Sequence, residues 1–433
     1  MKWILQCLML LCFGDVALSH FQIPGVPIVV LPEYTAYGIK NVTRKGTEAF
    51  LYLGLPYVKP PVRFEKPEPL TVTPLSFLKP KNATQWKPAC HQVVDVYPSA
   101  ITSEDCLYLN IFTPTKVGLK NLPVFVFIHG GGYSYGYTQA YGYEYFVDNF
   151  ISQNIIMVTL QYRLAHFGFF ATRDHVINGN FAHFDQLEAL KYIKRNIKAF
   201  GGDPNKITLS GHSAGSTSTH ALSLSPKTKD LYNQEIHIAG SNYALWGIAS
   251  EMVFNHSELI GTQVGCAQAN TLERKKCLQK VDYKKFWEAR VELGLPDFVP
   301  DKFDMLYWTS NFDNDFFGGK TLDELQAAAP KRRAMYGVDF GEGLLESIIT
   351  DNPITNVFSK SRGAYTYENR TLANAEKIRG VLLQMLTDPK FNSTTENVIV
   401  DRIFAYYNIG IGANATDPLH YWYKLTEVRH THT

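Results

Sequence analysis

The chain has 433 residues, of which 45% are hydrophobic and 19% are charged. This composition is typical of a globular protein and excludes a collagen-like, low-complexity or intrinsically disordered chain. Because 42 basic residues balance 40 acidic ones, the net charge of +2 creates no bulk field that would draw the protein to nucleic acid or acidic lipid. A substrate or partner must therefore be recognised at a local site.

The first residues have the pattern of a secretory signal peptide. Lys2 provides a positive start, residues 3–13 form an apolar run, and Ala17 and Ser19 offer small residues at the cleavage positions. The run is too short to span a bilayer, and no later stretch reaches about 18 uninterrupted apolar residues, so we expect no transmembrane anchor. This pattern predicts a signal peptide at 1–19 and a mature chain at 20–433 that is secreted or stays in the lumen of the secretory pathway.

Glycosylation sequons and cysteines fit that location. Six Asn-x-Ser/Thr sequons occur, at Asn41, Asn82, Asn255, Asn369, Asn392 and Asn414. The cysteines that follow the signal peptide are Cys90, Cys106, Cys266 and Cys277. In an oxidising compartment these four are expected to be paired. Four cysteines allow three pairings, and their spacing alone leaves all three open.

Short β-branched and aromatic runs alternate with a helical pattern along the chain. Runs typical of strands lie at 107–112, 124–128, 155–160, 207–210, 236–239 and 334–338. Between two of them, residues 184–200 place apolar side chains at helical spacing. Such alternation predicts an α/β domain with a large, mostly parallel sheet and helices on both faces. No internal repeat and no linker rich in Gly, Ser or Pro interrupts the chain, so we expect one large domain.

A Gly-x-Ser-x-Gly motif follows one of these strands, at Gly211, Ser213 and Gly215. Composition alone would produce such a motif about 0.15 times in a chain of this length, so its specificity comes from its place between a strand and a helix. There the glycines permit a turn so tight that the serine side chain stands above the sheet. The alternative, an ordinary strand-to-helix turn with an N-cap serine, does not explain the second glycine motif.

That second motif is His129 followed by three glycines at 130–132, directly after another predicted strand. A serine hydroxyl is a poor nucleophile at neutral pH, so acyl transfer needs a base and hydrogen-bond donors for the oxyanion that forms. The backbone N–H groups of Gly131, Gly132 and Ala214 are suited to be these donors, because glycine lets the main chain approach a substrate closely. A phosphate-binding loop is excluded, since no Lys-Ser or Lys-Thr follows the glycines. The two motifs predict Ser213 as a nucleophile beside an oxyanion hole.

From near Tyr37 almost to its end, the chain resembles the type-B carboxylesterase and cholinesterase family of α/β-hydrolases. The matching blocks are GLPYVKPP at 54–61, EDCLYLN at 104–110, HGGG at 129–132, YRL at 162–164, GN at 179–180 with DQ at 185–186, and FGGDP at 200–204. The resemblance implies the α/β-hydrolase fold, with a large, mostly parallel central sheet flanked by helices. It also implies the disulfides Cys90–Cys106 and Cys266–Cys277.

The same resemblance implies a triad of serine, acid and histidine in that chain order. Ser213 matches the nucleophile, and the segment 337–343 is similar to the family's segment that ends in Glu-Gly, which indicates Glu342 as the acid. Asp339 and Glu346 are competing carboxylates nearby. A solvated loop carboxylate is the alternative role for Glu342, but its place after the predicted strand 334–338 favours the triad.

The resemblance leaves the histidine open. The family's last block is similar to 420–425 and is followed by a long loop with Gly-x-x-His and a final helix, which this sequence, truncated at its C-terminus relative to the family, lacks. His430 and His432 follow that block and are the candidate bases; a frayed, solvated tail is the competing interpretation. Three explanations stay open: an incomplete form of a longer enzyme, a tail histidine that substitutes, or an impaired esterase with another role.

The sequence thus predicts a serine-type carboxylic ester hydrolase that acts on small to medium carboxylic esters and needs no cofactor, metal or nucleic acid. The alternative is a catalytically impaired binding or adhesion protein on the same fold that lacks the triad histidine. The segment between Cys90 and Cys106 holds no tryptophan, whereas cholinesterases use one there to bind a quaternary ammonium by cation–π attraction, so choline specificity is not expected. His183 departs from the family pattern, and we expect it to be a hydrogen-bonded core histidine.

Overall fold

A computed structural model describes residues 26–92, 99–116, 118–244, 247–295, 308–338, 374–385, 393–406 and 409. The predicted signal peptide at 1–19 lies outside the described residues. Within them, no helix is both long enough and apolar enough to cross a bilayer.

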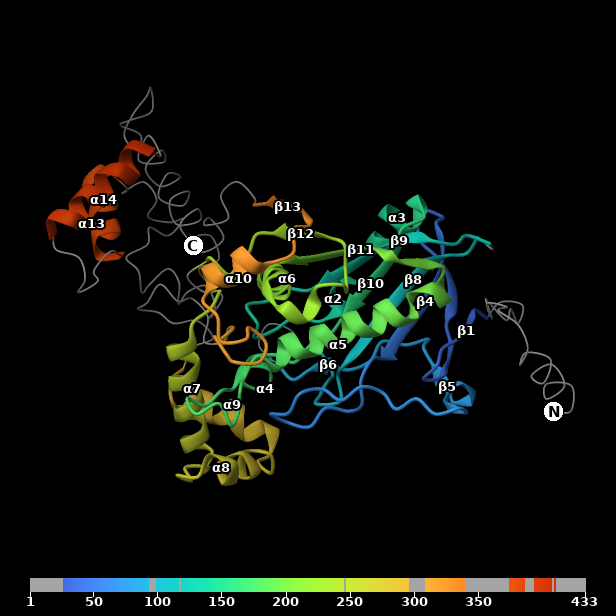
Figure 1. The fold of residues 1–433 in the computed structure, drawn as a ribbon, viewed down its shortest axis with the longest axis horizontal. Coiled ribbons are helices and arrows are strands. Elements are labelled where there is room, and N and C mark those ends of the chain that lie inside the picture. The colour runs from blue at the N-terminus through green and yellow to red at the C-terminus, as the bar shows by residue number, and fades with distance from the viewer. Residues whose placement is uncertain are drawn as a thin grey trace, which may run out of the picture.

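An eight-stranded sheet occupies the centre of the described structure (Figure 1). In spatial order its strands are β13 (Arg333–Gly337), β12 (Gln234–Ile238), β11 (Gly202–His212), β9 (Leu122–Ile128), β10 (Ile156–Leu160), β8 (Tyr108–Pro114), β4 (Glu48–Pro56) and β3 (Ile39–Val42). The first five of these run parallel. Each of the six predicted strands exists, and the α/β class is confirmed.

The sheet is mostly parallel, as predicted, and its other side is antiparallel. β8 pairs antiparallel with β10, β4 antiparallel with β8, and β3 antiparallel with β4. Parallel neighbours need a crossover of a dozen or more residues, usually a helix. β8 and β9 lie on either side of β10, and residues 115–121 between them are too few for a crossover helix, so the chain reverses direction there and the sheet is mixed.

Helices cover both faces of this sheet, which follows from the alternation of side chains along a strand. Ile111 and Val158 point into a core shared with α4 (Ala165–Phe169), α5 (Phe181–Asn196) and α6 (Ala214–Leu224). Their neighbours Phe112 and Met157 point the other way, into a smaller core covered by α3 (Glu144–Asn149) and the 3₁₀ turn Ile151–Gln153. Figure 1 shows α5 and α6 lying across one face. The predicted helix 184–200 is α5 followed by the 3₁₀ turn Ile197–Phe200.

The remaining described elements lie outside this sheet. Two small sheets contain β1 (Ile28–Val30), β2 (Thr35–Tyr37) and β5 (Pro80–Asn82), and β6 (Ala89–Cys90) with β7 (Thr102–Ser103). The other helices are α2 (Thr138–Tyr141), α7 (Ser250–Gln263), α8 (Thr271–Leu278), α9 (Tyr283–Glu292), α10 (Leu322–Ala328), α13 (Ala375–Met385) and α14 (Ser393–Tyr406), and the other 3₁₀ turns are Ser76–Leu78 and Pro226–Thr228. Local chemistry explains where α10 begins, because Thr321 and Glu324 form a capping box.

The four cysteines form the two disulfides that the family resemblance implied. Cys90 at the end of β6 is bonded to Cys106, with a Cα–Cα distance of 4.9 Å. Cys266, just after α7, is bonded to Cys277 in α8, with a Cα–Cα distance of 5.7 Å. The folded chain therefore selects one of the three pairings that cysteine spacing left open.

Candidate active site

Ser213 lies on the tight turn that the sequence predicts. β11 ends at His212 and α6 begins at Ala214, so Ser213 alone forms the junction. Its backbone has φ 55° and ψ −124°, a region that costs a non-glycine residue roughly 1–3 kcal/mol. Two backbone hydrogen bonds hold this conformation: Ser213 N–H donates to Ile238 O at 2.8 Å, and Thr217 N–H donates to Ser213 O at 3.0 Å.

Both glycines of the motif are required by close backbone contacts. A Cβ on Gly211 would lie 2.1 Å from Gly215 O, and a Cβ on Gly215 would lie 2.2 Å from Ile128 O. Neither contact can be relieved by moving a flexible side chain, since the opposing atom is a main-chain oxygen. The turn at Ser213 is therefore pressed against the end of β9, where the second glycine motif begins.

The glycine loop, which we define as residues 129–136, packs directly on this turn. A Cβ on Gly130 would lie 2.5 Å from His212 O and 3.0 Å from Ser213 Cβ. Gly131 and Gly132 have φ of 118° and 56°, which glycine tolerates best. Within the described residues, no backbone carbonyl accepts a hydrogen bond from either N–H. Ala214 N–H is at the first position of α6, where a helix offers no internal acceptor.

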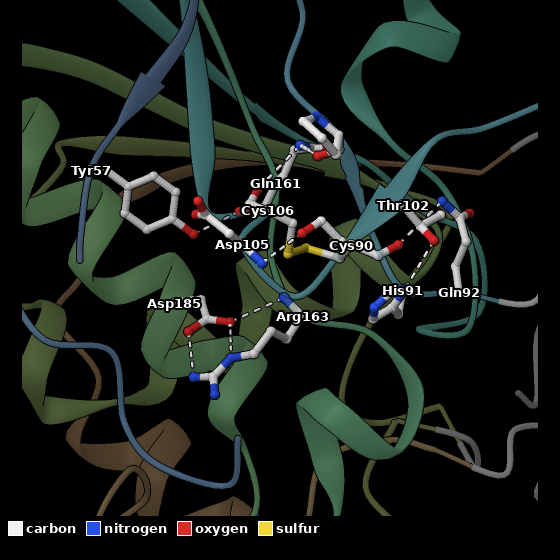
Figure 2. Close-up of a disulfide and its surroundings, with 12 residues drawn as sticks. Tyr57, Cys90, His91, Gln92, Thr102, Asp105, Cys106, Gln161, Arg163 and Asp185 are labelled. Carbon is white, nitrogen blue, oxygen red and sulfur yellow. Dashed lines mark hydrogen bonds and ion pairs between the residues drawn. A yellow bond between two sulfur atoms is a disulfide. The ribbon is translucent and has the colours of Figure 1, made fainter. Parts of the chain in front are cut away.

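Sequence analysis missed the residue that anchors the far end of the glycine loop, Gln92. Its Oε1 accepts a hydrogen bond from Gly136 N–H at 2.8 Å, and the side chain is 1% exposed. Gly136 in turn lies against Gly130, because a Cβ on it would come within 2.4 Å of Gly130 O. Gln92 follows the disulfided Cys90 by two residues (Figure 2). No sequence pattern marks this glutamine, since its partner lies 44 residues further along the chain.

The near end of the glycine loop is held by Tyr162, in the turn after β10. Its hydroxyl donates to His129 O at 2.8 Å, and its ring stacks on the His129 imidazole at a centroid distance of 4.5 Å. Burial lowers the pKa of His129 to about 4, so the imidazole is neutral at physiological pH. His129 is therefore a structural support of the loop.

The turn after β10 is tied to α5 by a buried ion pair (Figure 2). Arg163 Nε and Nη2 donate to the two carboxylate oxygens of Asp185 at 2.8 and 2.6 Å, and Arg163 N–H donates to the same carboxylate at 3.0 Å. Ala165 N–H then donates to Tyr133 O, in the glycine loop, at 2.7 Å. The YRL and DQ blocks thus belong to the framework that supports the loop.

His183 is the hydrogen-bonded core histidine that the sequence predicts. It is fully buried, with Nδ1 at 3.0 Å from Gln186 Oε1 and Nε2 at 2.7 Å from Ser310 Oγ. Burial lowers its pKa to about 4.

A cavity lies beside the Cys90–Cys106 disulfide. Its lining includes Arg63, His91, Glu104 and Phe167, and Ser213 is not part of it. The ester site is therefore not assigned to this cavity.

The predicted acid Glu342 and its competitors Asp339 and Glu346 lie outside the described residues. So do the candidate bases, His430 and His432, and the C-terminal segment that was compared with the family's last block. The strand that precedes Glu342 is described. β13 ends at Gly337, which pairs with Ile238, the residue that accepts the hydrogen bond from Ser213 N–H. The segment that carries Glu342 therefore starts one strand away from the nucleophile turn.

Three of the six sequons lie among the described residues. Asn82 on β5 and Asn255 on α7 are exposed, and Asn41 on β3 is half-buried. Asn369, Asn392 and Asn414 lie outside the described residues.

Comparison with known proteins gives one consistent result. A sequence model described as the carboxylesterase family matches residues 27–427. Gut esterase 1 of Caenorhabditis elegans is 36% identical over 315 residues, which are 71% of this chain and 53% of that protein. Esterase E4 of Myzus persicae is 40% identical over 246 residues, covering 55% of this chain and 43% of that protein. Acetylcholinesterase-1 of Trittame loki is 31% identical over 365 residues, which are 80% of this chain and 64% of that protein. The chain spans about half the length of the first two relatives.

Proposed function

The chain belongs to the carboxylesterase family, and on that premise we propose that it hydrolyses small to medium carboxylic esters through an acyl-enzyme on Ser213. The observation that carries this proposal is the contact between the strained turn at Ser213 and the glycine loop. A Cβ on Gly130 would lie only 3.0 Å from Ser213 Cβ, so the serine lies against the residue that directly precedes the proposed donors Gly131 and Gly132. Proximity of nucleophile and donors is what acyl transfer requires.

The proposed reaction has two steps. Ser213 Oγ attacks the ester carbonyl carbon while a base takes the hydroxyl proton, and the carbonyl oxygen becomes an oxyanion. The N–H groups of Gly131, Gly132 and Ala214 donate to that oxyanion, each contributing about 2.7–4 kcal/mol in the transition state. The alkoxide leaves with the proton, and water then attacks the acyl-serine, so the products are an alcohol and a carboxylic acid. These steps use only groups of the chain and water.

Glu342 is proposed as the acid that orients the base, with His430 and His432 as the candidate bases. The support for Glu342 is the position of β13, whose last residue pairs with Ile238, the acceptor of the hydrogen bond from Ser213 N–H. Substituting each histidine separately by glutamine identifies the base. Loss of turnover in one variant assigns it, and unchanged turnover in both excludes the pair.

The substrate is proposed to be a neutral small-molecule ester. The segment between Cys90 and Cys106 has no tryptophan for a quaternary ammonium group, which argues against choline esters. Two disulfides fit the proposed location, secreted or in the lumen of the secretory pathway, where the sequons would be glycosylated.

Turnover of p-nitrophenyl butyrate by the purified chain, with Ser213→Ala as the control, tests the function. Removing the nucleophile of a serine protease costs about 2 × 10⁶ in kcat, so turnover in the variant should fall to background. A fluorophosphonate should label the parent chain on Ser213 and leave the variant unlabelled. Equal turnover in the two chains, with no label on Ser213, would reject the esterase and favour the binding or adhesion protein.

A further inference from the structure

The second side of the nucleophile turn is formed by the segment that follows β12. We define residues 239–244 as the β12 loop. A Cβ on Gly240 would lie 2.4 Å from Ser213 O, so the loop backbone touches the backbone of the nucleophile. Ser216 Oγ, in the first turn of α6, donates to Gly240 O at 2.7 Å. Any displacement of the β12 loop is therefore transmitted to Ser213.

His220 anchors the outer part of this loop. It lies on α6 two turns after Ser213 and is 3% exposed. Its Nδ1 accepts a hydrogen bond from Asn242 N–H at 3.0 Å, and its Nε2 lies 3.3 Å from Gln326 Oε1 on α10. Because a backbone N–H can only donate, Nδ1 carries no proton, and the proton on Nε2 is donated to Gln326. One neutral imidazole thus joins α6, the β12 loop and α10.

From this geometry we infer that His220 is a positioning residue for Ser213, acting through its hydrogen bond to Asn242 N–H, which holds the β12 loop against the nucleophile turn. The inference rests on the proposed esterase function. His220 is not itself a candidate base, since both ring nitrogens are already bonded to groups other than Ser213.

The surroundings of His220 keep its imidazole neutral. Burial is the main cause of its lowered pKa, and the His237 ring on β12, at a centroid distance of 5.7 Å, adds to it. Glu235 on the same strand acts in the opposite direction. Tyr243 of the β12 loop packs beside the imidazole at 5.8 Å and interacts with Asp323 of α10. The acceptor on Nδ1 is therefore available at physiological pH.

Two nearly isosteric substitutions separate the hydrogen bond from the packing. His220→Asn keeps an acceptor, because Asn Oδ1 can occupy the place of Nδ1, whereas His220→Leu has a similar shape and no acceptor. Both variants lose the contact with Gln326, so their difference reports the acceptor that Nδ1 offers to the β12 loop, at Asn242 N–H and at Ser241 Oγ, 3.4 Å away. Hydrogen exchange of a peptide that covers the β12 loop should be at least about tenfold faster in His220→Leu than in His220→Asn, and exchange of a peptide that covers β9 should be equal.

Catalysis provides the second measurement. With p-nitrophenyl butyrate, His220→Leu should lower kcat by about 10- to 100-fold with little change in KM, since a misplacement of about 1 Å can cost about 10²-fold. His220→Asn should restore most of the rate and the fluorophosphonate labelling of Ser213.

Equal loop exchange in the two variants would overturn the inference, as would equal kcat in the two variants of an active enzyme. A parent chain with no turnover and no label would reject the proposed function itself. That failure is visible without either variant, so it is distinguishable from failure of the inference.

Discussion

Ser213 is held between two segments that differ in how they are anchored. The glycine loop follows β9 in the middle of the sheet and is held by Gln92 and Tyr162, whose hydrogen bonds do not depend on a titrating group. The β12 loop follows the strand next to the sheet edge and is held by the imidazole of His220. The edge strand itself, β13, is exposed at each of its five residues.

This difference indicates a division of roles. The oxyanion donors need a fixed geometry in every cycle, because preorganisation is the source of their effect. A buried framework that includes the Arg163–Asp185 ion pair and lies next to a disulfide provides that. The outer part of the β12 loop is held by Nδ1 of His220, which accepts from Asn242 N–H and lies 3.4 Å from Ser241 Oγ, and protonation of the imidazole would remove this acceptor.

The largest expected effect is on the framework of the glycine loop. Asp185→Ala leaves the buried Arg163 guanidinium without its carboxylate, and breaking such a pair costs about 3–5 kcal/mol of unfolding free energy. Glu251→Ala, which breaks the exposed pair with Arg173, is the matched control and should cost about 0–1 kcal/mol. Urea unfolding measures both. Similar losses of unfolding free energy in the two variants would show that the buried pair stabilises the fold no more than the exposed pair does.

The two disulfides differ in their relation to the glycine loop. Cys90–Cys106 lies two residues before Gln92, which binds that loop, whereas Cys266–Cys277 joins α8 to the segment just after α7. Replacing both members of either pair by serine should cost roughly 2–4 kcal/mol of unfolding free energy. Only the Cys90 and Cys106 variant should also lose kcat, because Gln92 follows Cys90 by two residues. Thermal unfolding and turnover are measured on the same preparations. An equal loss of kcat on removing Cys266–Cys277 would contradict the specific role of the first disulfide.

Gln92→Met tests the hydrogen bond to the glycine loop directly. Methionine has nearly the same shape and cannot accept from Gly136 N–H, so we expect kcat to fall by about 10- to 100-fold with KM little changed. Gln139→Met, at an exposed position on α2, is the control and should keep parental rates. A variant at position 92 with a raised KM and normal kcat would place the glutamine in substrate binding instead.

The last expected effect is confined to acidic pH and is a pH dependence of stability from the buried His183. The folded-state pKa of His183 is about 4, below the ordinary value of 6.5, so the unfolded chain binds a proton first. Its contribution is complete above about pH 6.5 and is lost as the pH falls toward 4, by about 1.4 kcal/mol per pH unit.

His183→Gln should therefore reduce proton uptake on unfolding by about one between pH 4.5 and 6. Urea unfolding across this range measures the slope, and the two chains should have parallel slopes between pH 7 and 8. Identical slopes in the acidic range would mean that His183 is not neutral in the folded chain.

Much of the site could be predicted because its signals are local. The turn at Ser213 needs Gly211 and Gly215 for reasons of backbone contact within a few residues. The strand before the glycine loop is a continuous apolar run at 124–128, and the strand before Ser213 alternates Ile207 and Leu209 with Thr208 and Ser210. A resemblance to a known family then connected these pieces and indicated the cysteine pairs. Glu342, His430 and His432 stay predictions from that resemblance.

The sequence by itself determined the α/β class, the nucleophile turn, the glycine loop and the number of cysteines available, since each depends on residue type and spacing along the chain. Only the tertiary structure decided that β8 joins its neighbours antiparallel, that Gln92 holds Gly136, and that His220 holds Asn242. These contacts join residues far apart in the chain. A polar side chain reaches such a partner only after the sheet has brought the two segments together, so no local sequence pattern predicts the hydrogen bond.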